Sequence, residues 1–197
     1  MEEDRLNNAK GNLISEFHLN ERLRASASLV PQKAQNILDM GCGEGYFLKM
    51  LLDKSQIDAI GIDSSNANLE FARKNAPKAK FFQRNALSTG FDTALFDCVS
   101  ALEIIDHVDK PMQLLVEARR VLRDGGALVI SFPESGPAWD TAWFLWTRTL
   151  GRRWLGEHEH FFKKGDMEDM LRKAGFDSIE SKTAFFGMIN VIRAVKA

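Results

Sequence analysis

A glycine-rich loop carries the clearest chemical signal in this sequence. Gly41, Gly43 and Gly45 alternate with other residues directly after an apolar run that ends at Met40. Glycine has no Cβ, so such a loop can turn sharply and let a ligand approach its backbone. A second apolar run ends at Asp63, where a carboxylate in an open α/β sheet accepts hydrogen bonds from the ribose hydroxyls of a nucleoside.

Both features also have plainer interpretations. The glycines could form an ordinary tight turn, and Asp63 could cap the helix that follows it. Their occurrence together at this spacing favours a nucleoside-containing ligand. The dinucleotide fingerprint G-x-G-x-x-G requires a glycine at position 46, where this chain has Tyr46. A nicotinamide-dependent oxidoreductase is therefore the weaker alternative.

The order of apolar patterns predicts the scaffold around this loop. Helical patterns follow the loop, begin again at Ser64 or Ser65 and near Pro111, and recur from Met167 to Ala174. Alternating strands and helices predict an α/β fold, a Rossmann-like, doubly wound, mostly parallel seven-stranded sheet with an antiparallel C-terminal hairpin. The runs typical of strands lie at 36–40, 57–62, 79–82, 96–102, 127–132, 178–184 and 189–196.

The length of 197 residues predicts a single domain over 1–197. Residues 1–30 look helical and are expected outside the sheet, and 133–164 are expected to form an insertion on the acceptor side. An apolar stripe from Leu114 to Leu122 predicts a helix that ends at Gly125–Gly126.

Composition excludes several classes of function. Lys and Arg number 26 against 27 Asp and Glu, a balance that argues against a dedicated duplex DNA-binding protein. The longest apolar run, 142–146, is far shorter than the roughly 20 residues that span a membrane, and the charged start shows no secretory signal. With two cysteines, Cys42 and Cys98, the expected compartment is a reducing cytoplasm.

Five stretches resemble the class I S-adenosylmethionine-dependent methyltransferases, most closely the small-molecule branch that includes the ubiquinone and menaquinone methylases. ILDMGCGEG at 37–45 is similar to the first motif and GIDSS at 61–65 to the acidic second motif; the others lie at 101–111, 121–133 and 158–176. The resemblance implies methyl transfer from S-adenosylmethionine to a small-molecule acceptor, aromatic or quinone-like. A non-catalytic module that binds the cofactor and regulates a partner is the alternative from another class.

The resemblance also assigns a cofactor site. It implies that Asp39 and the glycine loop hold the methionine part and that Asp63 holds the ribose. Ser64 stands where the family packs an apolar side chain on the adenine, and Asn85 where an Asp reads the adenine edge, so adenine binding is expected to be weaker. Asn85 could instead be an ordinary turn residue. The full predicted set is Asp39, Gly41, Cys42, Gly43, Gly45, Asp63, Ser64, Asn85, Ala86 and Leu102.

Methyl transfer to a hydroxyl also requires loss of a proton, so a nearby base would help. The candidates are Glu103, His107 and His160. Each histidine could equally be a structural residue that packs or donates a hydrogen bond. No metal site is predicted, because His158 and His160 lack a well-placed third ligand.

A tryptophan-rich segment follows the fifth predicted strand. Trp139, Trp143 and Trp146 recur at helical spacing, and such an aromatic wall would suit a flat acceptor. The same stripe could be part of the core or a dimer contact, which leaves a homodimer open.

Overall fold

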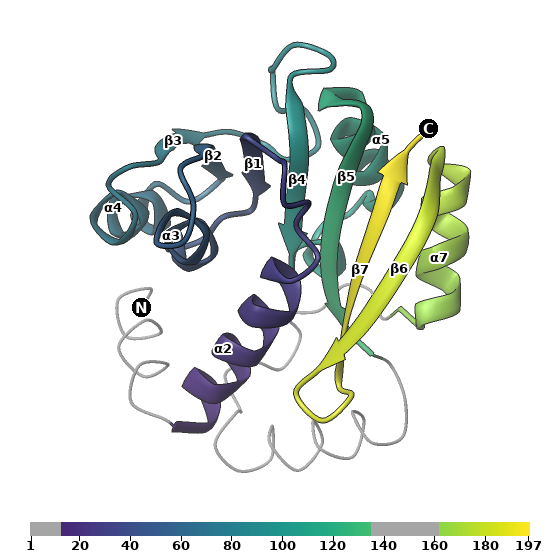
Figure 1. The fold of residues 1–197 in the computed structure, drawn as a ribbon, viewed down its shortest axis with the longest axis horizontal. Coiled ribbons are helices and arrows are strands. Elements are labelled where there is room, and N and C mark those ends of the chain that lie inside the picture. Colours follow the sequence, from purple (N-terminus) through teal and green to yellow (C-terminus); the bar gives the residue numbers. More distant parts are fainter. Residues whose placement is uncertain (1–12, 135–161) are drawn as a thin grey trace.

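The computed structural model describes residues 13–134 and 162–197. Within them, seven strands form one sheet in the order β3-β2-β1-β4-β5-β7-β6. The first five of these strands are parallel, whereas β7 runs antiparallel to β5 and β6 antiparallel to β7. The predicted fold class, a mostly parallel sheet that ends in an antiparallel hairpin, is therefore confirmed (Figure 1).

The strands are β1 (Asn36–Met40), β2 (Asp58–Asp63), β3 (Lys80–Gln83), β4 (Phe96–Leu102), β5 (Leu122–Pro133), β6 (Phe176–Ala184) and β7 (Ile189–Lys196). The helices are α2 (Leu13–Ala27), α3 (Tyr46–Leu52), α4 (Asn66–Asn75), the short 3-10 helix η1 (Ile105–His107), α5 (Pro111–Val121) and α7 (Lys164–Lys173).

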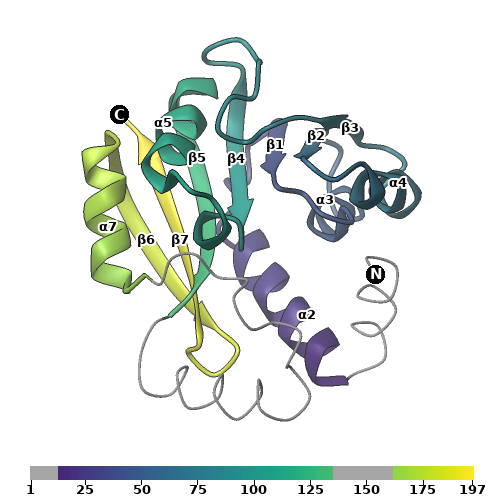
Figure 2. The same cartoon turned by 180° about the vertical axis from the view of Figure 1, so that it is seen from behind.

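Helices cover both faces of the sheet. Helices α2, α3 and α4 lie on one face (Figure 1). Their side chains Leu23, Leu48 and Leu69 belong to one cluster of buried apolar residues. Helices α5 and α7 lie on the other face (Figure 2). Their side chains Leu114 and Leu171 belong to a second cluster of buried apolar residues. Each such fully buried leucine contributes on the order of 1.5–3 kcal/mol. The two layers leave the carboxyl ends of the parallel strands as the edge where a ligand site can form.

The end of α5 differs from the sequence prediction. The helix ends at Val121, and Leu122 already has extended backbone (φ −72°, ψ 142°), so the expected continuation to Gly125–Gly126 is wrong. Leu122 pairs with Phe96 of β4, and its carbonyl oxygen accepts a hydrogen bond from Lys196 Nζ at 2.8 Å. These strand contacts outweigh the local helical pattern.

The start of α4 agrees with the prediction, since Ser65 is its N-cap and its hydroxyl accepts a hydrogen bond from the Asn68 backbone N–H at 3.3 Å.

Helix α2 lies beyond the carboxyl end of β4 (Figures 1 and 2). In the part of the chain that the structure describes, no helix has both the length and the apolar character needed to cross a membrane.

Candidate functional site

The glycine loop leaves β1 and turns into α3 at the carboxyl edge of the sheet. The backbone N–H groups of Gly41 and Cys42 both donate to the carbonyl oxygen of Ile62, at 2.8 and 2.9 Å, which ties the loop to the end of β2. Gly41, Gly43 and Gly45 have φ angles of 73°, 50° and 78°. This left-handed region is costly for residues with a Cβ, so the loop conformation requires glycine.

The three glycines face different surroundings. A Cβ at Gly41 would lie 2.5 Å from Ile104 Cδ1, and one at Gly45 would lie 3.1 Å from Ala72 Cα. A Cβ at Gly43 would meet nothing within 4 Å. Gly41 and Gly45 are therefore also needed for packing, whereas Gly43 presents bare backbone to open space. A cradle of this kind fits the methionine part of S-adenosylmethionine.

The Asp63 carboxylate lies directly beside this cradle. Its Oδ2 accepts a hydrogen bond from the Gly43 backbone N–H at 2.8 Å, and its Oδ1 accepts one from the Ser65 backbone N–H at 2.9 Å. The carboxylate thus joins the glycine loop to the turn before α4. Only Oδ1, which accepts from Ser65, agrees with the plainer interpretation that Asp63 caps this helix. The other oxygen fixes the side chain next to Gly43, and its contact with a ribose stays a prediction.

Asp39 is buried at the end of β1, beside Ser100 of β4. The Ser100 hydroxyl donates to Asp39 Oδ1 at 2.6 Å. Burial raises the pKa of Asp39 to about 7; the Ser100 hydrogen bond and the charge of Arg22 oppose this shift, and the charge of Asp63 adds to it. Sequence reasoning missed Ser100, although a polar residue inside an otherwise buried strand was an available signal.

Cys42 contributes backbone rather than thiol chemistry. Its Sγ lies beside Gly61, where an added Cβ would come within 2.8 Å of the sulfur. Burial raises the pKa of the Cys42 thiol, and the charges of Asp39 and Asp63 raise it further. The thiol is therefore protonated at neutral pH and inert as a nucleophile.

The predicted adenine residues lie at the neighbouring ends of β2 and β3. Ser64 and Asn85 are exposed, and Ala86 is buried. The amide oxygen of Asn85, the atom expected to face the adenine, accepts a hydrogen bond from the Leu87 backbone N–H at 2.8 Å. Asn85 thus has the turn role that the sequence left open, and its contact with adenine stays a prediction.

Glu103 follows β4 with a left-handed φ of 52°, directly after the half-buried Leu102. The Ser131 hydroxyl donates to Glu103 Oε1 at 2.9 Å, and Arg22 Nη1 of α2 lies 3.8 Å from Oε2. Sequence reasoning missed Arg22, because nothing local in the sequence links this helix residue to the end of β4. The structure thus brings a guanidinium and a carboxylate together beside the glycine loop.

His107 ends η1, on the same edge of the sheet. Its Nε2 lies 3.6 Å from Oδ2 of the buried Asp106, and its side chain is 38% exposed. The third predicted base, His160, lies outside the described residues, as do Trp139, Trp143 and Trp146. Over 13–134 and 162–197, no three His, Cys, Asp or Glu side chains are grouped in a way that could hold a metal ion.

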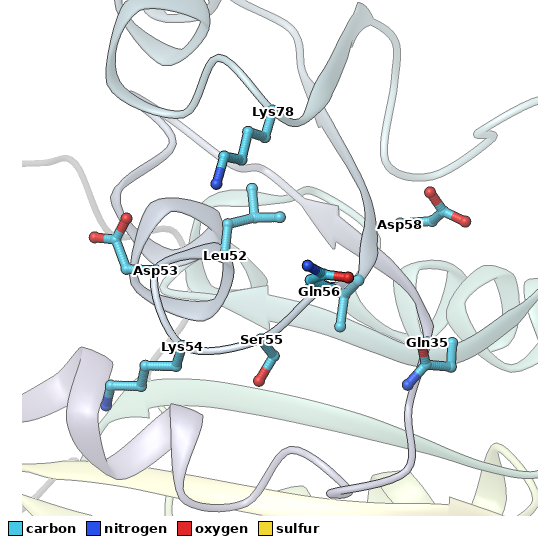
Figure 3. A pocket seen from close by; sticks show the side chains of 9 residues that line it. Gln35, Leu52, Asp53, Lys54, Ser55, Gln56, Asp58 and Lys78 are labelled. Carbon is cyan, nitrogen blue, oxygen red and sulfur yellow. The ribbon is translucent and has the colours of Figure 1, made fainter.

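A separate hollow lies at the opposite edge of the sheet (Figure 3). Gln35, which precedes β1, and Asp58, which begins β2, line it together with Lys54 and Lys78. These residues mark the amino ends of the parallel strands, whereas ligands of such sheets bind at the carboxyl ends. This hollow therefore lies away from the predicted cofactor site.

Comparison with known proteins identifies the family of this chain. Residues 12–181 match the family described as methyltransferase domain. The chain is 29% identical to a ubiquinone biosynthesis O-methyltransferase of Roseobacter denitrificans, over 85% of this chain and 70% of that protein. It is 27% identical to the enzyme of the same name from Cereibacter sphaeroides, over 82% and 68% of the two chains.

Solved structures agree on the fold. A methyltransferase from Thermotoga maritima superposes with a TM-score of 0.77 at 23% identity, over 94% of this chain and 92% of that one. A phosphoethanolamine N-methyltransferase from Haemonchus contortus, solved in complex with S-adenosyl-L-methionine, superposes with a TM-score of 0.71 at 18% identity, over 90% and 52%. The matched span, the fold and the glycine cradle agree, and the chain therefore belongs to the methyltransferase-domain family as a methyltransferase dependent on S-adenosylmethionine.

Proposed function

We propose that this enzyme methylates a hydroxyl oxygen of a small aromatic, quinone-like acceptor. The observation that carries the position of the reaction is the bond between the Gly43 N–H and Asp63 Oδ2 at the open face of the glycine loop. The names of the two ubiquinone biosynthesis O-methyltransferases, similar over most of this chain, support the acceptor class.

The cofactor supplies a methyl group on a positively charged sulfur, which an acceptor oxygen can displace in line. The glycine loop holds the methionine part through its bare backbone at Gly43, and Asp39 compensates positive charge there. Asp63 holds the ribose hydroxyls. Ser64, Asn85 and Ala86 line the adenine end, and Leu102 borders the reacting methyl group. Positioning of this kind can supply on the order of 7–11 kcal/mol of a barrier.

We assign Arg22 to the carboxylate of the methionine part. Its guanidinium lies 3.8 Å from Glu103 and near enough to Asp39 to lower the pKa of that buried carboxyl. A guanidinium binds a carboxylate with two parallel hydrogen bonds, which also fixes the orientation of the bound group. Glu103, which accepts a hydrogen bond from Ser131, then holds Arg22 in place from the other side.

We assign the role of general base to His107. The His107 side chain is 38% exposed at the same edge, and its Nε2 lies 3.6 Å from Oδ2 of the buried Asp106. The acceptor proton passes to the imidazole ring, and the Asp106 carboxylate near Nε2 stabilises the imidazolium that forms. A base of this kind contributes about 10²–10⁴-fold in rate.

The test separates binding from chemistry. Calorimetry with S-adenosylhomocysteine should give at least about tenfold weaker binding to Asp63→Ala than to the wild type, because two hydrogen bonds to the ribose are lost. His107→Gln should bind it normally but transfer radiolabelled methyl groups to catechol about 10²–10⁴-fold more slowly. Failure of the wild type to bind S-adenosylhomocysteine, or labelling of amines rather than hydroxyls, would contradict the proposal.

The predicted wall of Trp139, Trp143 and Trp146, the cytoplasmic location and a homodimer stay predictions. Lining of the acceptor by these tryptophans would suit a flat ring.

A further inference from the structure

Four aromatic side chains gather where α2 meets the hairpin between β6 and β7. We call Phe17, His18, Phe185 and Phe186 the aromatic patch. The centroid of the Phe17 ring lies 6.1 Å from that of Phe185 and 6.2 Å from that of Phe186. The ring centroids of Phe185 and Phe186 lie 5.5 Å apart. The imidazole of His18 meets Phe185 edge-on at 4.8 Å. The rings therefore form one continuous apolar surface.

The aromatic patch destabilises the fold through exposed apolar rings and strained backbone. Phe186 is 86% exposed and Phe17 47% exposed, although neither gains stability from contact with water. Phe185 and Phe186 also have left-handed φ angles of 47° and 57°, where Asn or Gly would be less strained. Exposed apolar surface and backbone strain at one place are typical of a binding site.

The patch lies at the same edge of the sheet as the methyl-transfer site. Leu102 at the end of β4 pairs with Ser131, and two residues further along β5, Pro133 pairs with Ile189 at the base of the hairpin. That step measures about 7 Å along the strand. On α2, His18 lies one helical turn before Arg22, which contacts Glu103. Both elements thus connect the patch with the residues around the reacting methyl group.

The patch is also uncharged, even though Arg22 is nearby. Burial, and to a smaller extent the charge of Arg22, lowers the pKa of His18 to about 4. At neutral pH the imidazole is therefore neutral, and the patch presents only apolar rings and one neutral heterocycle. Such a surface suits a hydrocarbon group and not an anion.

We propose that the aromatic patch binds a hydrocarbon substituent of the acceptor while the acceptor's hydroxylated ring lies at the methyl-transfer site. This inference rests on the proposed methylation of a small aromatic acceptor and adds the part of that acceptor that decides its affinity. The step of about 7 Å along β5, from the residue paired with Leu102 to the base of the hairpin, is longer than a methyl group and corresponds to a substituent of several carbons.

The test compares catechol with 4-hexylcatechol, titrated calorimetrically in the presence of saturating S-adenosylhomocysteine. Phe186→Asn removes the most exposed ring and suits the left-handed turn, because Asn tolerates that conformation. We expect this variant to bind 4-hexylcatechol about tenfold more weakly than the wild type and catechol equally well. The matched control is Val116→Asn, which removes a 53% exposed apolar side chain from α5 and should change neither affinity.

Several results would overturn the proposal. One is that the wild type binds 4-hexylcatechol no more tightly than catechol. Another is that Phe186→Asn leaves the ratio of the two affinities unchanged. Loss of a dimer in sedimentation, or loss of binding to phosphatidylglycerol vesicles, without a change in 4-hexylcatechol affinity, would assign the patch to a second copy or to a membrane surface. If both probes bind as expected but neither is methylated, the proposed acceptor chemistry fails and the patch assignment stands.

Discussion

The hydroxyl of Ser100 on β4 donates a 2.6 Å hydrogen bond to the Asp39 carboxylate on β1, and both residues are buried at paired positions of the two strands. The bond favours the ionised carboxylate and so opposes the effect of burial on its pKa. The charge state of Asp39 near neutral pH thus depends on a side chain of the neighbouring strand β4.

Ser100→Ala should raise the pKa of Asp39 above about 7. If Asp39 faces the ammonium group of S-adenosylhomocysteine as proposed, the affinity for this ligand should rise with pH until the carboxyl has lost its proton. The variant should shift this rise to higher pH, and Ser100→Thr should restore the wild-type curve. Dissociation constants measured by calorimetry from pH 5.5 to 9 check this, and superimposable curves would rule out the role.

Asp39→Asn should separate stability from binding. The folded-state pKa of Asp39, about 7, lies above the ordinary value of 3.8, so ionisation of this carboxyl destabilises the folded state. The wild-type free energy of unfolding should therefore fall as pH rises from about 4 to about 7, by at most about 4 kcal/mol from this group. Relative to the wild type, the variant should become progressively more stable over that window.

Urea unfolding of both proteins between pH 4 and pH 8 measures this difference. The same variant should bind S-adenosylhomocysteine at least about tenfold more weakly, because a neutral amide cannot compensate the ammonium charge. A stability difference that does not change with pH would show that Asp39 is ionised throughout.

Two glycine substitutions should differ in their main effect, one on stability and the other on ligand binding. Both Gly43→Ala and Gly45→Ala place a Cβ at left-handed φ, which costs about 1–2 kcal/mol. At Gly45 the Cβ also meets the Ala72 backbone at 3.1 Å, so this variant should unfold at a clearly lower temperature. At Gly43 the Cβ enters open space beside Asp63, so that variant should fold but bind S-adenosylhomocysteine poorly. Calorimetric scans with and without the ligand distinguish the two, and equal melting temperatures would contradict this division.

Glu117→Gln tests a buried carboxylate of α5 that holds Thr89, four residues after Asn85 of the predicted adenine site. Hydrogen bonds from Arg120, and then from the Thr89 hydroxyl and backbone N–H, lower the pKa of Glu117 to about 2 against the cost of burial. A lowered carboxyl pKa stabilises the folded state above the ordinary value of 4.5 and loses that effect as pH falls toward 2.

The Glu117→Gln variant should therefore be less stable than the wild type by about 1–3 kcal/mol at pH 7, and nearly equal to it at the acid end of the range. Urea unfolding at pH 7, 4 and 3 follows the difference. A constant difference would show that the lost interaction does not depend on the charge of Glu117.

Local sequence patterns determined much of the scaffold. The predicted runs at 36–40, 96–102 and 189–196 are the observed β1, β4 and β7, because short apolar runs between turn residues specify buried strands. The glycine spacing and Asp63 likewise located the loop, since the left-handed turns at these positions require glycine.

Only the tertiary structure decided which distant side chains complete the site. Ser100 reaches Asp39 across 61 residues because the sheet places β4, and not β3, beside β1. Arg22 reaches Glu103 because α2 lies beyond the end of β4 (Figure 1). The same long-range pairing made Leu122 a strand residue against its local helical pattern. Contacts of this kind depend on strand order and on packing between layers, which no local periodicity contains.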